Sequence, residues 1–358
     1  MNGFLVLESG EVFSGHWHGG KNRIGEVVFN TSHSGYEEIA TDPSYYKQIV
    51  VMTAPMQGNY GESNSVWESQ QFWIEGFICV QIQDSQSNKS WLKKLVNAEV
   101  PVVSDMDTRR LVLSLRSGGT QWGALVSAES EAEAQKIAKS LLSQRFEIKK
   151  DWVWEVSRKK SQIQKGDNPK GPKIAVLDFG SKENILREFR THASELHILP
   201  SRSSKAEILA VKADALILTN GPGDPADVEK STETVKSLIG EIPVMGICMG
   251  HQILALAMGG KTYKMKFGHR GSNHPVKDEL LNQIYMTSQN HGYAVKDDSL
   301  PAWVKVTHRN LNDQTVAGFY SAEKKVLGIQ YHPESCPGPH DAKGLFTFFI
   351  EQLARNAT

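Results

Sequence analysis

The sequence is short of several features that would assign it to a specialised class of protein. Its three cysteines form no even set and no C-x-x-C pair, so a reducing compartment fits best and disulfides are not expected. No stretch approaches the roughly 20 apolar residues of a membrane helix, and no basic-then-apolar leader opens the chain. Forty basic residues balance forty acidic ones, which argues against nucleic acid or an anionic membrane as the main partner. We therefore expect a cytoplasmic protein that acts on a small molecule.

Phosphate-binding and metal-binding motifs are missing as well. The N-terminal half has no G-x-G-x-x-G and no Walker loop. His16 and His18 are the nearest approach to a metal-ligand cluster there, and such a pair is more typical of a polar strand edge. The sequence therefore predicts no metal and no cofactor in this chain.

Two regions that differ in their predicted secondary-structure pattern are joined by a polar segment. Residues 1–150 contain short β-like runs separated by Gly, Asn and Pro turns, which predicts a strand-rich α+β domain. Residues 151–171 are polar and basic, as in an interdomain linker. Residues 172–358 alternate strand and helix patterns as far as about 260, then turn to hairpins and close on a helix over 341–354. This predicts an α/β domain whose parallel sheet is covered by helices on both faces.

The stretch from Ile242 to Leu254, IPVMGICMGHQIL, predicts a buried strand that runs into a helix through Cys248. Gly246 and Gly250 flank the cysteine in a G-x-C-x-G pattern, the thiol form of a nucleophile elbow. At a helix N-terminus the helix dipole favours the thiolate, which makes Cys248 a candidate nucleophile. The alternative is a small buried cysteine in a strand–helix joint.

A base and its orienting group follow later in the chain. His332 and Glu334, in GIQYHPES, come just after the apolar run 326–331. A cysteine, a histidine base and a carboxylate that orients the base are chemically sufficient for nucleophilic catalysis. Without the elbow, we would interpret this pair as charged residues of an ordinary solvated loop.

Two loops could complete such a site. Residues 220–225, NGPGDP, follow a predicted strand, and their glycines together with the N–H of Met249 could form an oxyanion hole. Residues 288–293, SQNHGY, lie between two strand-like segments and suit a substrate clamp. Taken singly, the first could be an ordinary turn and the second a hairpin connection.

The motifs GICMGHQ, NGPGDP, SQNHGY and YHPE, in this order, resemble those of the class I (triad) glutamine amidotransferases. The resemblance implies that Cys248 attacks the side-chain amide of glutamine, with His332 and Glu334 completing the triad. Ammonia would then leave from a γ-glutamyl thioester.

The N-terminal half carries a second resemblance. The stretch that begins GEVVFNTSHSGYEEIATDPSYYKQ, together with DMDTRRLVLSLRSGGTQWG, is similar to the small subunits of carbamoyl phosphate synthetases. KMKFGHRGSNHPV in the second half fits the same family. This implies a large ATP-dependent partner subunit, with ATP and magnesium on that partner, in a heterodimer or an assembly of heterodimers. The implied glutamine contacts are Ser44, Gly221, Gly223, Met249, Gln252, Asn290, Gly292 and Tyr293. Met249 and Tyr293 stand where the family usually has leucine and phenylalanine.

Three other functions remain open at this point. The chain could be the amidotransferase subunit of another pathway, such as anthranilate or guanylate synthesis, although residues 1–150 disfavour this. It could be an assembly partner that has kept the fold and lost the chemistry, against which the complete triad argues. It could also be a free-standing cysteine hydrolase or peptidase of related fold.

Overall fold

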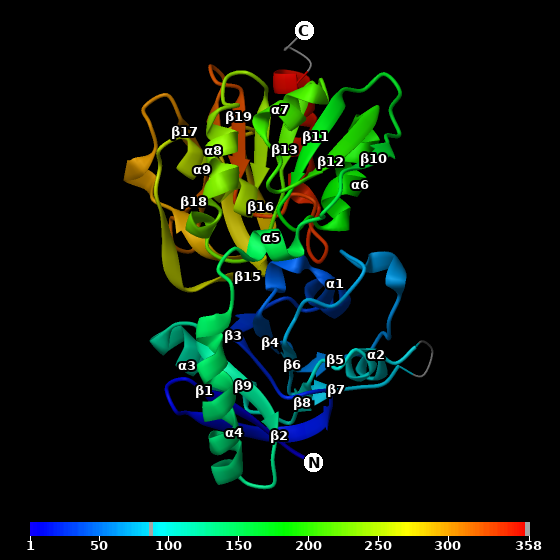
Figure 1. Ribbon diagram of the computed structural model, residues 1–358, viewed down its shortest axis with the longest axis vertical. Helices are drawn as coiled ribbons and strands as arrows, with labels where there is room; N and C mark the ends of the chain where they lie inside the picture. Colours follow the sequence, from blue (N-terminus) through cyan, green and yellow to red (C-terminus); the bar gives the residue numbers. More distant parts are fainter. Residues whose placement is uncertain (86–88, 355–358) are drawn as a thin grey trace. The chain divides into compact units, whose positions relative to one another are not determined.

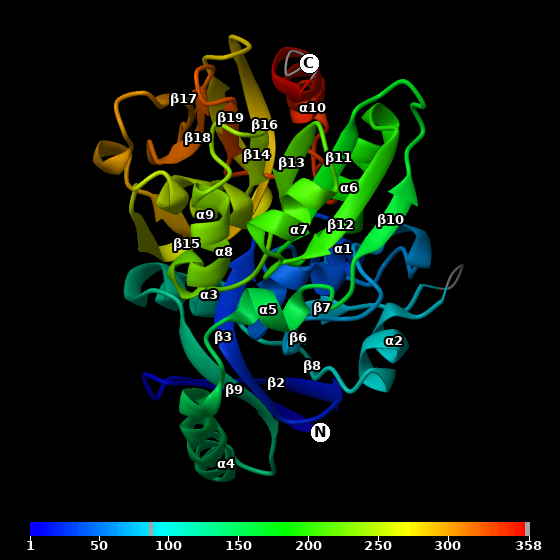
Figure 2. The same cartoon turned by 45° about the horizontal axis from the view of Figure 1, so that its top comes forward.

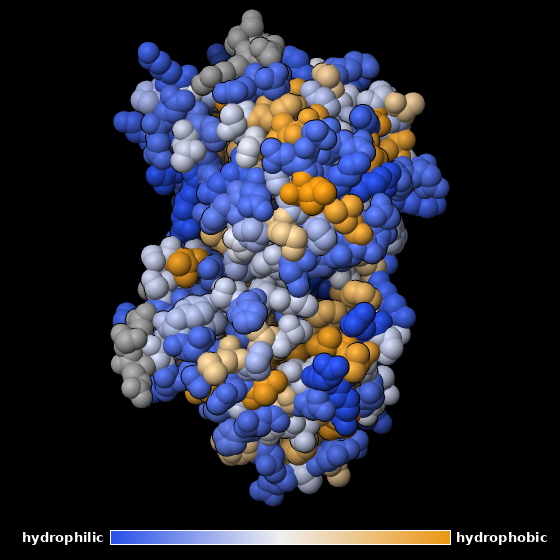
Figure 3. All heavy atoms as spheres, turned by 180° about the vertical axis from the view of Figure 1, so that it is seen from behind, coloured by the Kyte–Doolittle hydropathy of each residue, from blue (hydrophilic) through white to orange (hydrophobic). Residues whose placement is uncertain are grey.

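The computed structural model describes residues 1–85 and 89–354, and the chain divides into two compact units, Met1–Lys149 and Lys150–Thr358 (Figure 1). Hydrophilic residues make up most of the face seen in Figure 3, with hydrophobic residues in separate groups between them. None of the helices in the described ranges is long and apolar enough to cross a membrane.

The first unit is built on a closed barrel with the strand order β1-β2-β8-β6-β4-β3-β9. Its strands are β1 (Asn2–Leu7), β2 (Val12–Gly19), β3 (Arg23–Asn30), β4 (Gln48–Met52), β6 (Gly76–Ile78), β8 (Val102–Ser104) and β9 (Gln121–Ser127). A separate pair joins β5 (Met56–Gln57) to β7 (Gln81–Ile82). The strand-rich character is as predicted, whereas closure into a barrel depends on pairings that no local pattern reveals.

Helices flank this barrel: α1 (Tyr36–Thr41), α2 (Trp91–Asn97), α3 (Thr108–Gly118) and α4 (Glu131–Ser143), with 3-10 turns η1 (Pro43–Tyr45), η2 (Asn64–Val66) and η3 (Gln144–Glu147). Asp107 caps α3 by accepting from the N–H of Arg110. The buried residues of α4 recur every fourth position, at Ala134, Ala138 and Leu142, and pack against Phe4 and Val126 of the barrel.

The second unit contains a ten-stranded sheet with the order β10-β12-β11-β13-β14-β19-β18-β17-β15-β16. Its strands are β10 (Gln162–Lys165), β11 (Lys173–Asp178), β12 (Glu195–Pro200), β13 (Ala215–Leu218), β14 (Val244–Ile247), β15 (Thr262–Asp278), β16 (Gln283–Val295), β17 (Lys305–Asn310), β18 (Val316–Ser321) and β19 (Val326–Ile329). From β12 to β19 neighbours pair in parallel, and the remaining strands pair antiparallel. The predicted α/β sheet is therefore confirmed.

Helices cover both faces of this sheet. The helical segments are α5 (Trp152–Val156), α6 (Glu183–His192), α7 (Lys205–Ala210), α8 (Glu229–Lys236), α9 (Met249–Ala257) and α10 (Gly344–Phe349), with the 3-10 turns η4 (Pro225–Asp227), η5 (Asp297–Ser299) and η6 (Asp341–Lys343). The helix expected over 341–354 is instead η6, α10 and a π-helical turn, η7 (Ile350–Ala354). Figure 2 shows α7, α8 and α9 in front of the sheet.

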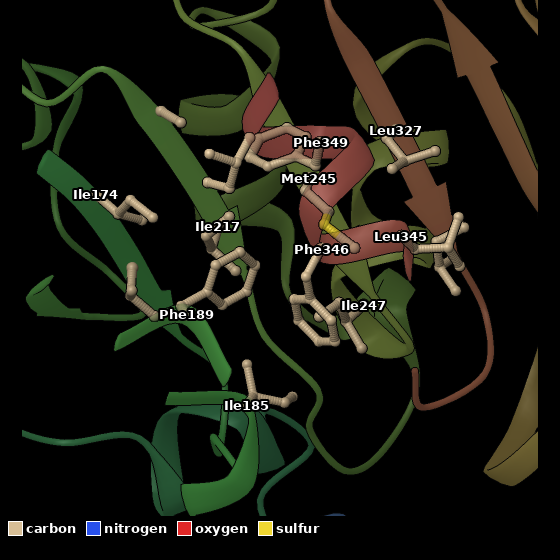
Figure 4. Packing of buried hydrophobic residues seen from close by; sticks show 14 of the residues in the cluster. Ile174, Ile185, Phe189, Ile217, Met245, Ile247, Leu327, Leu345, Phe346 and Phe349 are labelled. Carbon is tan, nitrogen blue, oxygen red and sulfur yellow. The ribbon is translucent and has the colours of Figure 1, made fainter. Parts of the chain in front are cut away.

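One apolar core lies on each side of the sheet. On one side Phe189 of α6 meets Phe346 of α10 edge to face, with 5.0 Å between the ring centroids, in the same cluster as Ile217 and Met245 of the strands (Figure 4). On the other side Ile253 of α9 lies among residues of α5, α7 and α8. Both faces of the central strands are buried, which explains their nearly continuous apolar sequences.

The segment 151–171 is not a linker of extended chain. It forms α5, whose Val153 is fully buried in the core, and β10, which pairs antiparallel with the outer edge of β12. The segment looks like a linker because an edge strand leaves most of its side chains in solvent, so polar composition does not distinguish the two.

Candidate active site

Cys248 lies at a sharp turn between β14 and α9. Its backbone has φ 55° and ψ −103°, outside the usual regions for a residue with a side chain. A Cβ atom on Gly246 would lie 2.4 Å from the carbonyl oxygen of Gly250, and one on Gly250 would lie 2.2 Å from that of Leu218. Both flanking positions therefore require glycine, and the nucleophile elbow predicted from the sequence is present.

His332 reaches the same place because β19 runs parallel to β14 and directly beside it. The N–H of Cys248 donates to the carbonyl of Ile329 at 2.8 Å, and the N–H of His332 donates to that of Ser288 at 2.9 Å. The thiol of Cys248 points to the carbonyl oxygen of Asn290, 3.5 Å away. The structure thus brings three of the predicted site residues, Cys248, Asn290 and His332, together.

Glu334 fixes the orientation of the histidine ring. Nδ1 of His332 lies 2.7 Å from Oε1 of Glu334, so Nδ1 carries the proton that the carboxylate accepts. Burial alone lowers the pKa of His332, but the Glu334 carboxylate and the Cys248 thiol outweigh burial, and the pKa is raised. Nε2 is buried and forms no standard hydrogen bond with any residue in the described ranges, so it is placed to exchange a proton with the thiol.

Lys182 is a residue of this site that sequence reasoning missed. Its ammonium group lies 3.0 Å from Oε1 of Glu334 and also donates to the carbonyl oxygen of Ser335. Burial raises the pKa of Glu334, whereas Lys182 and His332 lower it more, so the group is held ionised. The sequence signal that could have indicated Lys182 is its place just after β11. The carboxyl end of that strand lies at the same edge of the sheet as the elbow.

The loop 220–225 is locked to both neighbouring loops. Asn220 accepts from the N–H of Lys182 at 3.0 Å, and the N–H of Gly250 donates to the carbonyl of Thr219 at 2.9 Å. A Cβ on Gly221 would lie 2.2 Å from the carbonyl oxygen of Phe179, and Gly223 has φ +90°. Met249 opens α9, so its N–H has no acceptor within the helix. The bond between Gly250 and Thr219 therefore places the start of this loop beside the elbow, and the oxyanion hole itself remains a prediction.

The segment 288–293 is not a loop between strands but part of the long strand β16. The irregularity falls instead on its partner β15, whose register shifts between Lys264 and His269 and again between Gly271 and His274. Asn290, Gly292 and Tyr293 therefore sit on a strand, and the carbonyl of Tyr293 accepts from Nε2 of Gln252 at 2.8 Å.

Ser44 belongs to the first unit, in η1, where its N–H donates to Asp42 at 2.8 Å. It is buried, with 5% of its surface exposed. Its contact with glutamine remains a prediction. In the described part of the chain, no three His, Cys, Asp or Glu side chains converge as metal ligands would.

Two separate parts of the chain match models of known protein families. Residues 175–352 match the model of the family described as glutamine amidotransferase class-I, and residues 5–125 match the carbamoyl-phosphate synthase small chain, CPSase domain. The chain is 42% identical to the carbamoyl phosphate synthase small chain of Symbiobacterium thermophilum, over 98% of each chain. It is 41% identical to the chloroplastic small chain of Arabidopsis thaliana, covering 99% of this chain and 86% of that one. The pyrimidine-specific small chain of Bacillus subtilis is 40% identical, covering 98% and 95%.

Proposed function

Because the chain belongs to the carbamoyl phosphate synthase small-chain family, we propose that it is the glutaminase subunit of a glutamine-hydrolysing carbamoyl phosphate synthetase. It hydrolyses L-glutamine and passes ammonia to a large subunit, which carries ATP and magnesium and makes carbamoyl phosphate from bicarbonate. The product serves pyrimidine and arginine biosynthesis, and the compartment is the cytoplasm. The observation that supports this most is the contact of Cys248, His332 and Glu334 in a chain whose N-terminal half matches the same family.

The first half of the reaction forms a covalent intermediate. The Cys248 thiolate attacks the γ-carboxamide carbon, and the carbonyl oxygen takes negative charge that the N–H of Met249 and the 220–225 loop stabilise. His332, which has taken the thiol proton at Nε2, returns it to the amide nitrogen. The carbon–nitrogen bond breaks, ammonia leaves, and a γ-glutamyl thioester remains on Cys248.

The second half releases glutamate. Nε2 of His332 takes a proton from water, whose oxygen attacks the thioester carbon, and the thiolate leaves. Throughout both steps Glu334 holds Nδ1, and Lys182 holds Glu334. The buried carboxylate balances the charge on the imidazolium each time the ring carries two protons.

Purification of the chain from its own cells tests the proposal. We expect a larger chain to copurify, with bicarbonate-dependent ATPase activity and glutamine-dependent synthesis of carbamoyl phosphate. A chain that is isolated alone and turns over glutamine at full rate without a partner would contradict the proposal. Synthesis from added ammonia by the complex is the control for an intact partner.

A further inference from the structure

The turn that follows Glu334 has a backbone conformation that few residues adopt. Ser335 and Cys336 have φ of 63° and 55°, in the left-handed region that favours glycine. Neither residue is a glycine, so contacts from elsewhere in the fold must hold the turn. Glu334 and Ser335 are fully buried, with 0% of their surface exposed. Their backbone polar groups therefore need partners within the protein.

The peptide group between Glu334 and Ser335 is held at both ends. Its carbonyl oxygen, on Glu334, accepts from Nδ2 of Asn184 at 2.6 Å. Its N–H, on Ser335, donates to the carbonyl oxygen of His332 at 3.0 Å. A carbonyl oxygen can only accept hydrogen bonds, so the group of Asn184 that faces it is the NH₂. The two bonds fix the plane of the peptide group, and the plane in turn sets φ of Ser335.

Asn184 lies in the first turn of α6, and 8% of its surface is exposed. Lys182, two residues earlier, binds the carboxylate of Glu334 and the carbonyl of Ser335. The start of α6 thus contacts both the carboxylate that orients His332 and the backbone that carries this carboxylate. The contact of Lys182 with the carboxylate balances charge, whereas the bond from Asn184 joins two neutral groups and acts through geometry.

We propose that Asn184 is a positioning residue, which holds the peptide group after Glu334 so that the carboxylate stays within hydrogen-bond distance of the His332 ring. This inference rests on the proposed glutaminase function. Without the Asn184 amide, the peptide group can turn at its carbonyl end, because the turn relieves the left-handed conformation of Ser335. The carboxylate and this carbonyl branch from one Cα, so the carboxylate then shifts from its 2.7 Å contact with Nδ1. Lys182 does not prevent the shift, since an ammonium group on a flexible stem can follow the carboxylate.

Variants at both ends of α6, each assembled with the partner subunit, test this role. Asn184→Ala and Asn184→Leu both remove the donor, one with a loss of volume and one at nearly constant shape. An effect that the two share therefore comes from the lost bond. Asn168→Ala is the matched control, because Nδ2 of Asn168 donates to the carbonyl of His192, the last residue of α6, at 3.3 Å.

We expect both Asn184 variants to lower kcat for glutamine hydrolysis about tenfold to a hundredfold, as for a misplaced catalytic group, with KM within about twofold. Alkylation of Cys248 by iodoacetamide should slow as well, because His332 holds the thiol proton less firmly when Glu334 is displaced. Asn168→Ala should keep the original kcat and alkylation rate. Synthesis from added ammonia and the thermal midpoint show that each variant is folded and assembled.

A second comparison tests whether Asn184 acts through the left-handed turn. Glycine adopts a positive φ without strain, so Asn184→Ala should lower kcat by a smaller factor when Ser335→Gly is also present. Ser335→Gly removes a hydroxyl that donates to the carbonyl of Pro339. Ser335→Ala removes the same hydroxyl and keeps the strain. In the Ser335→Ala background, Asn184→Ala should therefore lower kcat by as large a factor as in the unaltered chain.

Equal factors in the Ser335→Gly and Ser335→Ala backgrounds would overturn the inference, since Asn184 would then not act through the turn. An Asn184→Ala variant that matches Asn168→Ala would overturn it too, as would Asn184 variants that lose ammonia-dependent synthesis together with glutamine hydrolysis. If the unaltered complex failed to hydrolyse glutamine, the proposed function itself would be wrong, which is a different result from any of these.

Discussion

The ammonium group of Lys182 lies 3.0 Å from the carboxylate of Glu334, and neither side chain has more than 3% of its surface exposed. Glu334 also binds Nδ1 of His332, so a cation stands on each side of one buried carboxylate whenever the ring is protonated. Two charges removed from water stabilise a protein only when they are paired, and loss of one leaves the other uncompensated.

We expect Lys182→Met to lower the free energy of unfolding by about 3 to 5 kcal/mol, because a buried carboxylate loses its ion-pair partner. Glu334→Gln in the same chain should restore part of that loss, since the neutral amide needs no cation. Urea denaturation of the two single variants and the double variant measures the coupling. Strictly additive losses would mean that the pair contributes nothing to stability.

Cys248→Ser should abolish glutamine-dependent synthesis in the assembled enzyme and leave synthesis from added ammonia intact. A serine hydroxyl is far less acidic than a thiol, and only the generation of ammonia needs the nucleophile. The two syntheses are measured side by side on one preparation. Loss of both activities in a folded, assembled variant would show that the two reactions are not separable as proposed.

His332→Asn and Glu334→Gln should lower glutaminase turnover by different amounts. His332 moves protons in both halves of the reaction, so its loss should lower turnover by several orders of magnitude. Glu334→Gln can still hydrogen-bond the imidazole, although with a less favourable tautomer, and should keep residual turnover and a nearly normal KM. Steady-state glutaminase assays decide between them, and equal, near-complete losses would show that Glu334 does more than orient the ring.

Ser44→Ala should raise the KM for glutamine about threefold to tenfold, as expected for one lost hydrogen bond. The N–H of Ser44 that binds Asp42 remains in the alanine variant, so the turn η1 should be retained. Glutaminase kinetics and a thermal melt of the same sample test both points. An unchanged KM would make Ser44 a turn residue only.

Acid should destabilise the second unit through three histidines. Burial lowers the pKa of His251 to about 3 and of His274 to about 4, and it lowers that of His291 well below the ordinary value. Below about pH 6.5 the unfolded chain binds protons at these rings and the folded chain does not, so stability falls with pH by about 1.4 kcal/mol per unit for each ring. Urea denaturation between pH 5 and 6.5 measures this directly, and the slope for all three rings should approach roughly 4 kcal/mol per pH unit toward the acid end of this range.

His274→Gln isolates one of these contributions, since it should reduce that slope by about one third. His332 has the opposite sign, because its pKa is raised in the folded chain. Its proton stabilises the fold below the ordinary histidine pKa, and this stabilisation is lost as the pH rises through the folded value. A slope that did not change in His274→Gln would contradict the assignment.

The elbow was predictable because its requirements are local. Two glycines around one cysteine, between a strand pattern and a helix pattern, leave few other conformations. Lys182 was not predictable in this way, because its role arises from a contact with Glu334, which is 152 positions away in the chain. No pattern within a window of sequence reports such a contact.

The wrong prediction for 151–171 has a different cause. Composition measures how much of a segment is polar, and an edge strand such as β10 can be as polar as a linker although its backbone pairs with a neighbouring strand. The single buried residue that distinguishes α5 from a loop, Val153, is too little to give a periodic signal in five residues.

The place of α5 and β10 determines where the amidotransferase half can be separated for expression. A fragment that began at Pro172 would strip the outer edge of β12, exposing unpaired backbone groups that favour aggregation. It would also remove Trp152, whose side chain packs against the position of Gly223 in the 220–225 loop. A fragment that begins at Lys150 keeps both, so a catalytic defect found in a fragment from Pro172 but not in one from Lys150 would report the damaged sheet edge, whereas the absence of the N-terminal barrel and its Ser44 is common to both fragments.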